Sequence, residues 1–101
     1  MTGFVQRYYG EEITLHDIAS AGHVGSSTCC ALFKKNLHMT PIGYLTRYRL
    51  EKGAELLRNL DLSVTEISLA VGFSGPSYFT ESFRKHFGLT PSEYRKHPQQ
   101  S

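Results

Sequence analysis

Cysteine, long apolar stretches and strong net charge are all scarce in this chain. Its 101 residues include only two cysteines, and these are adjacent, Cys29 and Cys30. Neighbouring cysteines rarely bridge, because a disulfide needs side chains that converge, so we expect free thiols, as is usual in the cytoplasm. No apolar run approaches the ~18 residues of a membrane span, and no charged-then-apolar signal segment opens the chain. The sequence therefore favours a cytoplasmic protein with no membrane partner.

Residue groups that support catalysis or metal binding are missing as well. The five histidines are scattered, and no second cysteine pair is present to complete a zinc site. The sequence contains no clustered acid pair, no nucleophile with a neighbouring base and no glycine-rich phosphate loop. We therefore expect no enzymatic activity, no metal and no cofactor.

The net charge of +2 is weak evidence for a polyanionic partner, but its distribution is uneven. Before residue 30 there is one basic residue against three acids, whereas from residue 30 onward ten basic residues face six acids. Much of this charge comes in the pairs Lys34-Lys35, Arg84-Lys85 and Arg95-Lys96. A solvated helix face explains any single pair, but two pairs at equivalent positions of a repeat favour a functional surface.

That repeat is the most informative pattern in the chain. Residues 27–44 recur fifty positions later as 77–94, while the segment around Ile18 recurs forty-nine positions later at Ile67. The difference of one residue falls in a turn, where insertions are tolerated. Each copy has one helical pattern, a short turn and a second helical pattern. A duplicated helix–turn–helix achieves within one chain what most such proteins achieve by dimerising.

The chain is predicted to be all-α, with seven helices, because helix start signals are dense and strand-like alternation is absent. Capping boxes at 14–17 and 63–66 begin two helices, and Thr-Pro pairs at 40–41 and 90–91 begin two more. Helices are expected over residues 3–9, from 14–17 to Gly22, about 26–37, about 41–59, from 63–66 to Gly72, about 76–87, and from 90–93 to Pro98. We expect Gly22 to end its helix with a positive φ, and the last three residues to fray.

One domain, 1–101, is expected, because no low-complexity linker interrupts the chain. It comprises subdomain one (about 3–38), a linker helix (about 41–59) and subdomain two (about 63–97). The linker spans roughly 28 Å at ~1.5 Å per residue. Glycine at position 53 costs up to ~1 kcal/mol inside this helix, which indicates close packing there.

Helical periodicity selects the core and fixes which residues point outward. In the third helix Cys29 and Phe33 share one face, and in the sixth helix Phe79, Phe83 and Phe87 do so. The other expected core residues are Phe4, Val5, Tyr8 and Tyr9 in the first helix, Leu15, Ile18 and Ala19 in the second, and Ile42, Tyr44, Leu45, Tyr48, Leu50, Leu56 and Leu57 in the fourth.

In the third and sixth helices, the faces opposite the core residues form two outward stripes with spacing i, i+3, i+4 and i+7. The stripe residues are Ser27, Cys30, Ala31 and Lys34 in the third helix and Ser77, Thr80, Glu81 and Arg84 in the sixth. In a helix–turn–helix this part of the second helix enters the major groove. We expect all of these stripe residues except Lys34 to read bases. The expected phosphate contacts are Lys34, Lys35, Arg47 and Lys85, together with backbone N–H groups at helix starts.

The two stripes differ in chemistry. Cys30 and Ala31 offer apolar contact with a thymine methyl but few hydrogen bonds, whereas Glu81 can accept from cytosine N4 and Arg84 can reach guanine or a phosphate. We therefore predict that the second motif discriminates more strongly between sequences. Arg49 is as compatible with a structural ion pair as with DNA contact.

These residues resemble the DNA-binding domain of the AraC/XylS family of bacterial transcription regulators. The second half carries the similarity most clearly, in residues 63–74 (SVTEISLAVGFS), 77–79 (SYF) and 83–95 (FRKHFGLTPSEYR). The resemblance implies two helix–turn–helix motifs joined by a rigid helix, with both recognition helices in successive major grooves, ~34 Å apart, of one asymmetric duplex site. It also implies contact with RNA polymerase in activators, and a separate sensor or receiver domain. We therefore expect this chain to be a fragment, with a small stand-alone regulator as the alternative.

Two departures from the family pattern stand out. Cys30 and Ala31 replace long polar side chains, and Gly53 replaces alanine. An alternative function, a helical protein-interaction module, predicts apolar outward stripes, whereas Lys34, Glu81 and Arg84 are charged.

Overall fold

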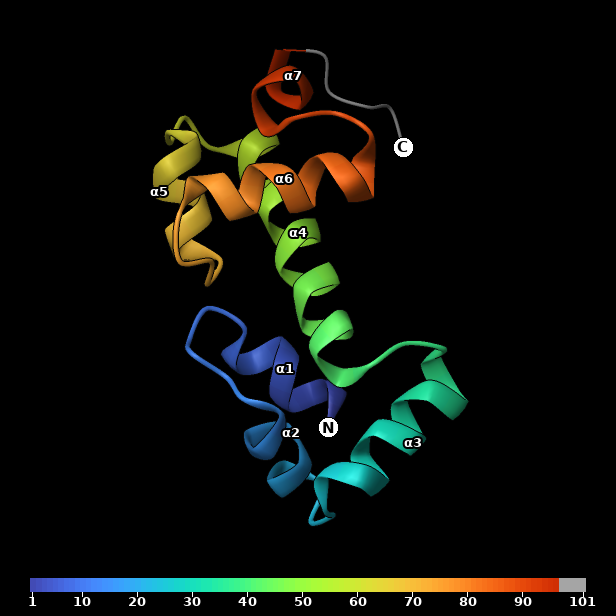
Figure 1. Cartoon of the computed structure of the whole chain (residues 1–101). Coiled ribbons are helices and arrows are strands. Elements are labelled where there is room, and N and C mark those ends of the chain that lie inside the picture. Colours follow the sequence, from blue (N-terminus) through green and yellow to red (C-terminus); the bar gives the residue numbers. More distant parts are fainter. Residues whose placement is uncertain (97–101) are drawn as a thin grey trace. The chain divides into compact units, whose positions relative to one another are not determined.

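The structure, a computed structural model, describes residues 1–96, and within them it contains seven helices and no strand, as predicted (Figure 1). The helices are α1 (Thr2–Tyr8), α2 (Leu15–Ala21), α3 (Ser26–Leu37), α4 (Pro41–Asn59), α5 (Val64–Ala70), α6 (Pro76–Phe87) and α7 (Pro91–Lys96). The expected bounds of α3, α4 and α6 are confirmed, and α1 both begins and ends one residue earlier than expected. The predictions made for Pro98 and for the last three residues lie outside the described part of the chain.

Three capping boxes fix the starts of α2, α5 and α7. Thr14 Oγ1 accepts from the backbone N–H of Asp17 at 3.1 Å, and an Asp17 carboxylate oxygen accepts from the N–H of Thr14 at 2.9 Å. Ser63 and Glu66 make the same two bonds, and so do residues 90 and 93. Each box satisfies two backbone donors that a helix start otherwise leaves open.

The prediction that Gly22 adopts a positive φ is wrong. Gly22 has φ −97°, and the left-handed residue is the next one, His23, with φ 56°. The helix end tightens before it reverses: Gly22 N–H donates to Ala19 O at 3.0 Å, and Val24 N–H donates to the same oxygen at 3.1 Å. This six-residue closure is the Schellman motif, which places its left-handed residue after the C-cap. The second copy follows the same rule with Gly72, at φ 100°.

The chain divides into two compact units, Met1–Tyr48 and Arg49–Ser101, and the boundary falls inside α4. The repeat explains this division. The start of α4 in the first unit corresponds to α7 in the second, since Tyr44 and Tyr94 are both buried fifty residues apart. The later part of α4 corresponds to α1, since Val5 and Ala54 are both buried forty-nine residues apart. Each unit is therefore a helix–turn–helix between an opening and a closing helix.

The core of the first unit joins all of its helices. Its fully or almost fully buried members are Val5, Ile18, Ala19, Cys29, Phe33, Tyr44 and Leu45. Tyr44 is buried but keeps a polar partner, because its hydroxyl accepts a hydrogen bond from Gln6 Nε2 at 3.0 Å. Ile42, which was expected to face the core, is instead 42% exposed. The core side of α4 begins with Pro41 and Tyr44, and Ile42 lies off that face.

The core of the second unit is built from aromatic rings. Phe79 and Phe83, both fully buried, have ring centroids 5.6 Å apart, and Phe83 lies 5.4 Å from the Tyr94 ring in an edge-on arrangement. Arg58 Nη1 donates to the Tyr94 hydroxyl at 2.6 Å. Gly53 is buried against Phe79, and a Cβ at this position would lie 2.8 Å from that ring. The close packing predicted for Gly53 is confirmed.

Candidate nucleic-acid interface

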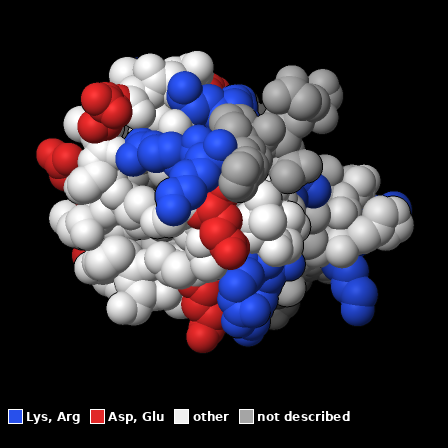
Figure 2. Space-filling model, turned by 90° about the horizontal axis from the view of Figure 1, so that it is seen from above, with Lys and Arg blue, Asp and Glu red and all other residues white. Residues whose placement is uncertain are grey.

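On the face shown in Figure 2, basic side chains form more than one group. These groups of Lys and Arg stand beside Asp and Glu. This agrees with the small net charge of +2. A net charge this small gives little general attraction to a polyanion, so the positions of individual basic residues matter more than their sum.

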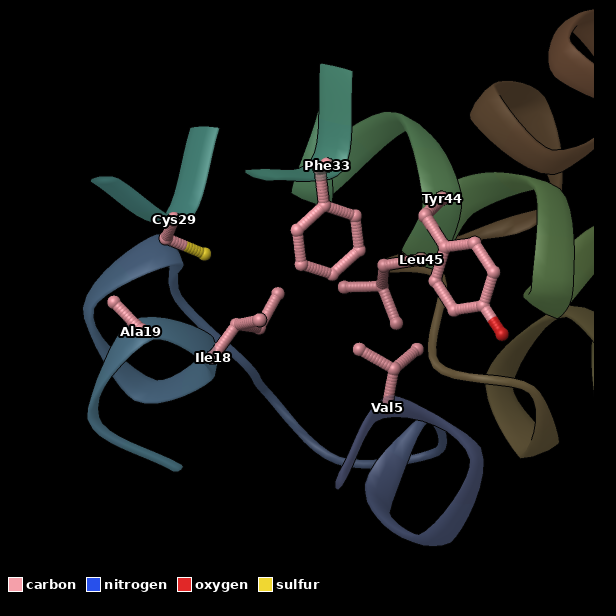
Figure 3. Packing of buried hydrophobic residues seen from close by; sticks show 7 residues of the cluster. All are labelled: Val5, Ile18, Ala19, Cys29, Phe33, Tyr44 and Leu45. Carbon is pink, nitrogen blue, oxygen red and sulfur yellow. The ribbon is translucent and has the colours of Figure 1, made fainter. Parts of the chain in front are cut away.

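The inward side of α3 is anchored as predicted. Cys29 and Phe33 point into the core of the first unit, toward Ile18 and Val5 (Figure 3). Burial raises the pKa of the Cys29 thiol. Both cysteines are free, as expected, with Cys30 only half-buried. The anchors fix the rotation of α3 about its own axis, and so they determine which residues it presents to solvent.

The outward stripe of α3 lies at the surface. Ser27, Ala31, Lys34 and Lys35 are exposed, and Cys30 is half-buried at the edge of the stripe. These residues span the first two turns and a half of the helix. Their side chains are short until Lys34, so the helix backbone itself can approach a partner closely.

The outward stripe of α6 forms a single shallow feature. Ser77, Thr80, Glu81 and Arg84 line one open hollow of about 450 Å³, together with Pro76 at the start of the helix. The structure thus brings together the four predicted residues of this stripe. Two hydroxyls, a carboxylate and a guanidinium converge there, and this set can both donate to and accept from base edges.

The repeat in sequence is also a repeat in exposure. Buried, half-buried and exposed residues of 26–44 match their counterparts in 76–94 at every pair except Thr40 and Thr90. Both second helices have twelve residues and follow a glycine cap that makes no side-chain hydrogen bond, Gly25 or Gly75. The first N–H groups of the two helices are therefore not capped by side chains, and such groups suit an anionic oxygen. In α3 they begin at Ser26, whereas in α6 they begin at Ser77, because Pro76 has no N–H.

The remaining arginines differ from one another. Arg47 is exposed on α4. Arg49 is half-buried, and burial lowers its pKa while the nearby Tyr78 hydroxyl acts in the opposite direction. Arg95 is structural: its guanidinium donates to the carbonyls of Leu57 at 3.4 Å and Leu60 at 3.1 Å, at the end of α4. The pair Arg95-Lys96 is thus not simply a solvated basic pair.

Sequence reasoning did not select Tyr78, which lies in the first turn of α6 with 55% of its surface exposed. Tyr78, Glu81 and Lys85 are spaced i, i+3 and i+7, so they lie along one side of the helix. This spacing beside two charged residues could have indicated that Tyr78 is exposed.

Among the described residues, no three histidine, cysteine or acidic side chains are grouped so that they could hold a metal ion. Within the same part of the chain, no helix has the length and apolar character needed to cross a bilayer.

Comparison with known proteins assigns the family. The helix–turn–helix domain family matches residues 18–97. An uncharacterized HTH-type transcriptional regulator of Bacillus subtilis, YdeC, is 42% identical over 96 residues, which cover 95% of this chain and 33% of that protein. The lactose operon transcription activator of Staphylococcus xylosus is 37% identical over 94 residues, covering 93% of this chain and 34% of its own length. The chain therefore spans about a third of these curated relatives.

A solved structure agrees over nearly the full length. The C-terminal domain of AraT, a response regulator from Geobacillus stearothermophilus, is 31% identical with a TM-score of 0.89, and the match covers 98% of this chain and 83% of that one. The repeat, the two anchored recognition helices and these similarities agree with one another. This chain belongs to the AraC-type helix–turn–helix family of bacterial transcription regulators, whose helix–turn–helix domains bind DNA.

Proposed function

We propose that this chain reads one asymmetric DNA site through two half-sites, with α3 in the major groove of one half-site and α6 in that of the other. The observation that carries the proposal is the outward stripe of α6. Ser77, Thr80, Glu81 and Arg84 line one open hollow, while Phe79 on the opposite side is fully buried. A helix held on one side, with polar groups exposed near its N-terminus, suits insertion into a major groove.

The second motif supplies most of the sequence discrimination. Glu81 is a pure acceptor when ionised, so it favours the exocyclic amino group of cytosine and disfavours the oxygens of guanine and thymine. Arg84, one turn further along, donates to guanine O6 and N7. Ser77 and Thr80 add short hydroxyls that can pair with either kind of base edge.

The first motif contributes close apolar contacts with thymine rather than hydrogen bonds. Ala31 is exposed at the centre of its stripe, and Cys30 is half-buried beside it. Both are small and weakly polar, so they suit close contact with a thymine C5-methyl group. Ser27 is the one strong hydrogen-bonding group among the three base-reading residues of this stripe. We therefore expect the half-site of α3 to tolerate more substitutions than that of α6.

Phosphate contacts hold the two helices in register. Lys34, Lys35 and Lys85 are exposed at the far ends of the stripes, and Arg47 is exposed on α4. The N-terminal N–H groups of α3 and α6 add donors without a net charge. Because each lysine or arginine contact releases counterions, affinity should fall steeply as salt rises.

The role of the whole protein goes beyond this domain. One relative is a transcription activator, and this supports contact with RNA polymerase. The curated relatives are about three times as long, and this supports a separate sensor or receiver domain in the complete regulator. Because a bacterial chromosome lies in the cytoplasm, this function implies a cytoplasmic location.

Selection of genomic DNA fragments with the 101-residue chain, at two salt concentrations, tests the proposal. We expect enrichment of one asymmetric motif with two half-sites about one helical turn apart, the sharper of which belongs to α6. Salt-sensitive binding that is blind to sequence would show that specificity needs more than this domain. A lack of binding even at low salt would favour a protein-interaction module instead.

A further inference from the structure

Tyr78 stands out among the exposed residues because it combines a large ring, high exposure and a fixed position. It is 55% exposed, more than any other exposed large hydrophobic side chain of the described residues. Its position in the repeat is taken by Thr28 in the first motif. The solvated face of α3 therefore needs no aromatic ring at this place, and a role specific to the second motif is called for.

The base of the ring is anchored to the core. Phe73 is 5% exposed, and its ring meets the Tyr78 ring edge-on, with centroids 5.4 Å apart and planes at 63°. Phe73 in turn packs on the fully buried Phe79, with centroids 5.1 Å apart. Tyr78 thus projects from α6 with its ring already positioned. A contact made by a pre-positioned ring loses little conformational entropy on binding.

Tyr78 borders the stripe of α6 that is proposed to face DNA, on the side of Glu81. Tyr78, Glu81 and Lys85 follow at i, i+3 and i+7, and all three are exposed. The glycine cap of α6 makes no side-chain hydrogen bond, so the neighbouring first-turn N–H groups carry no side-chain acceptor. The half-buried Arg49 guanidinium lies close enough to interact electrostatically with the Tyr78 hydroxyl. The Tyr78 hydroxyl donor and the Arg49 cation are close to each other, and their shared complement is an anionic oxygen.

We propose that Tyr78 is a DNA-positioning residue whose hydroxyl donates a hydrogen bond to one backbone phosphate of the half-site bound by α6. This rests on the proposed function of α6. The contact fixes the position of α6 on the DNA and therefore which bases Glu81 and Arg84 reach. Like other contacts with the DNA backbone, it reads no base itself. The first motif, with Thr28 at this position, lacks the contact.

Tyr78→Phe removes the hydroxyl and keeps the ring that packs on Phe73. We expect the variant to bind every DNA sequence about tenfold more weakly than the wild type, because a hydrogen bond to a charged oxygen is lost. The ranking of sequences should not change. The salt dependence should not change either, because the phenol is neutral, whereas Lys85→Ala should lower the slope by about one. Tyr8→Phe, on α1, serves as the matched control and should bind as the wild type does.

A second measurement locates the contact. Each phosphate of the half-site of α6 is replaced in turn by a neutral methylphosphonate. At one position the loss of affinity seen with the wild type should shrink to less than about twofold in Tyr78→Phe, because the two changes remove the same interaction.

Unchanged affinity of Tyr78→Phe, with intact wild-type binding, would overturn the inference alone, as would a changed preference at a single base pair. Absence of sequence-selective binding by the wild type would overturn the proposed function together with it. Equal thermal midpoints of Tyr78→Phe and the wild type exclude a folding defect as the cause of weaker binding.

Discussion

His38 and Gly88 end the two recognition helices in the same way. Each has a left-handed backbone, with φ 59° and 82°. His38 N–H donates to Lys34 O at 3.0 Å, and Gly88 N–H donates to Arg84 O at 2.8 Å. The second motif uses glycine at this position, where a side chain strains the backbone, and the first motif does not.

His38→Gly should therefore stabilise the first unit. Relief of the left-handed strain stabilises the folded state by about 1–2 kcal/mol. Glycine also raises the conformational entropy of the unfolded chain, and this offsets part of the gain. We expect a net gain of roughly 0.5–1 kcal/mol in the free energy of unfolding, measured by urea denaturation. The same substitution two residues earlier, Asn36→Gly, lies in right-handed helix and should be destabilising. Equal effects at the two positions would contradict the strain argument.

Gly53→Ala should destabilise the second unit even though alanine is the better helix former. The new Cβ would lie 2.8 Å from the ring of the fully buried Phe79. Overpacking costs typically 1–3 kcal/mol, and this exceeds the helix propensity gain of up to about 1 kcal/mol. We expect a net loss of about 1 kcal/mol in unfolding experiments. Gly3→Ala is the control, because nothing lies within 4 Å of its added Cβ. A Gly53→Ala protein more stable than the wild type would show that the ring moves freely.

Acid should weaken the helix starts through the capping boxes. The pKa values of Asp17, Glu66 and Glu93 are lowered, because each carboxylate accepts a hydrogen bond from the backbone N–H of its cap residue. A lowered folded-state pKa means that this stabilisation is complete above the usual values, 3.8 for Asp and 4.5 for Glu. It is then lost as pH falls through the lower folded-state values.

The unfolding midpoint should thus drop between pH 6 and pH 3, and the drop should be smaller in the triple variant Asp17→Asn, Glu66→Gln, Glu93→Gln. Glu12→Gln lies outside the capping boxes and is the matched control. Identical pH profiles for the wild type and the triple variant would assign the acid sensitivity to other groups.

Arg95→Ala should loosen the contact between α7 and the end of α4. The guanidinium donates to two main-chain carbonyls there, and hydrogen bonds from charged groups to such carbonyls contribute about 1.5–3 kcal/mol when well shielded. Because this group is partly solvated, we expect a loss of about 1 kcal/mol. The adjacent exposed Lys96→Ala should be neutral. Amide exchange at α7 is the most local readout, and unchanged protection in Arg95→Ala would contradict this role.

Local signals predicted most of the fold. Hydroxyl caps and Thr-Pro pairs located the helix starts, and the apolar periodicity of α3 and α6 identified Cys29, Phe33, Phe79 and Phe83 as core residues. The two failures have different origins, one in the local backbone and one in tertiary packing. His23 adopts a left-handed backbone because the end of α2 tightens before reversing, and no side-chain pattern announces this. Ile42 is apolar and was therefore expected in the core, but α4 packs on the core through Pro41 and Tyr44, and Ile42 is exposed.

The candidate site was predictable as two faces but not in detail. The outward stripes follow from the anchors, so Ser77, Thr80, Glu81 and Arg84 could be selected together. Tyr78 was missed because it lies beside the stripe that begins at Ser77, and its packing against Phe73 does not follow from helical spacing. The equivalence of α1 with the later part of α4 was hidden, because it rests on buried positions rather than on shared residue types.

The base preferences of two variants test the central claim, that the stripes read bases while the lysines hold phosphates. Glu81→Ala and Lys35→Ala are compared with the wild type on a library of all single substitutions of the selected site. We predict that Glu81→Ala relaxes the preference at one base pair, with a change of about 1–3 kcal/mol there. Lys35→Ala should weaken all sequences about equally and lower the salt slope. The same uniform loss in both variants would contradict the account.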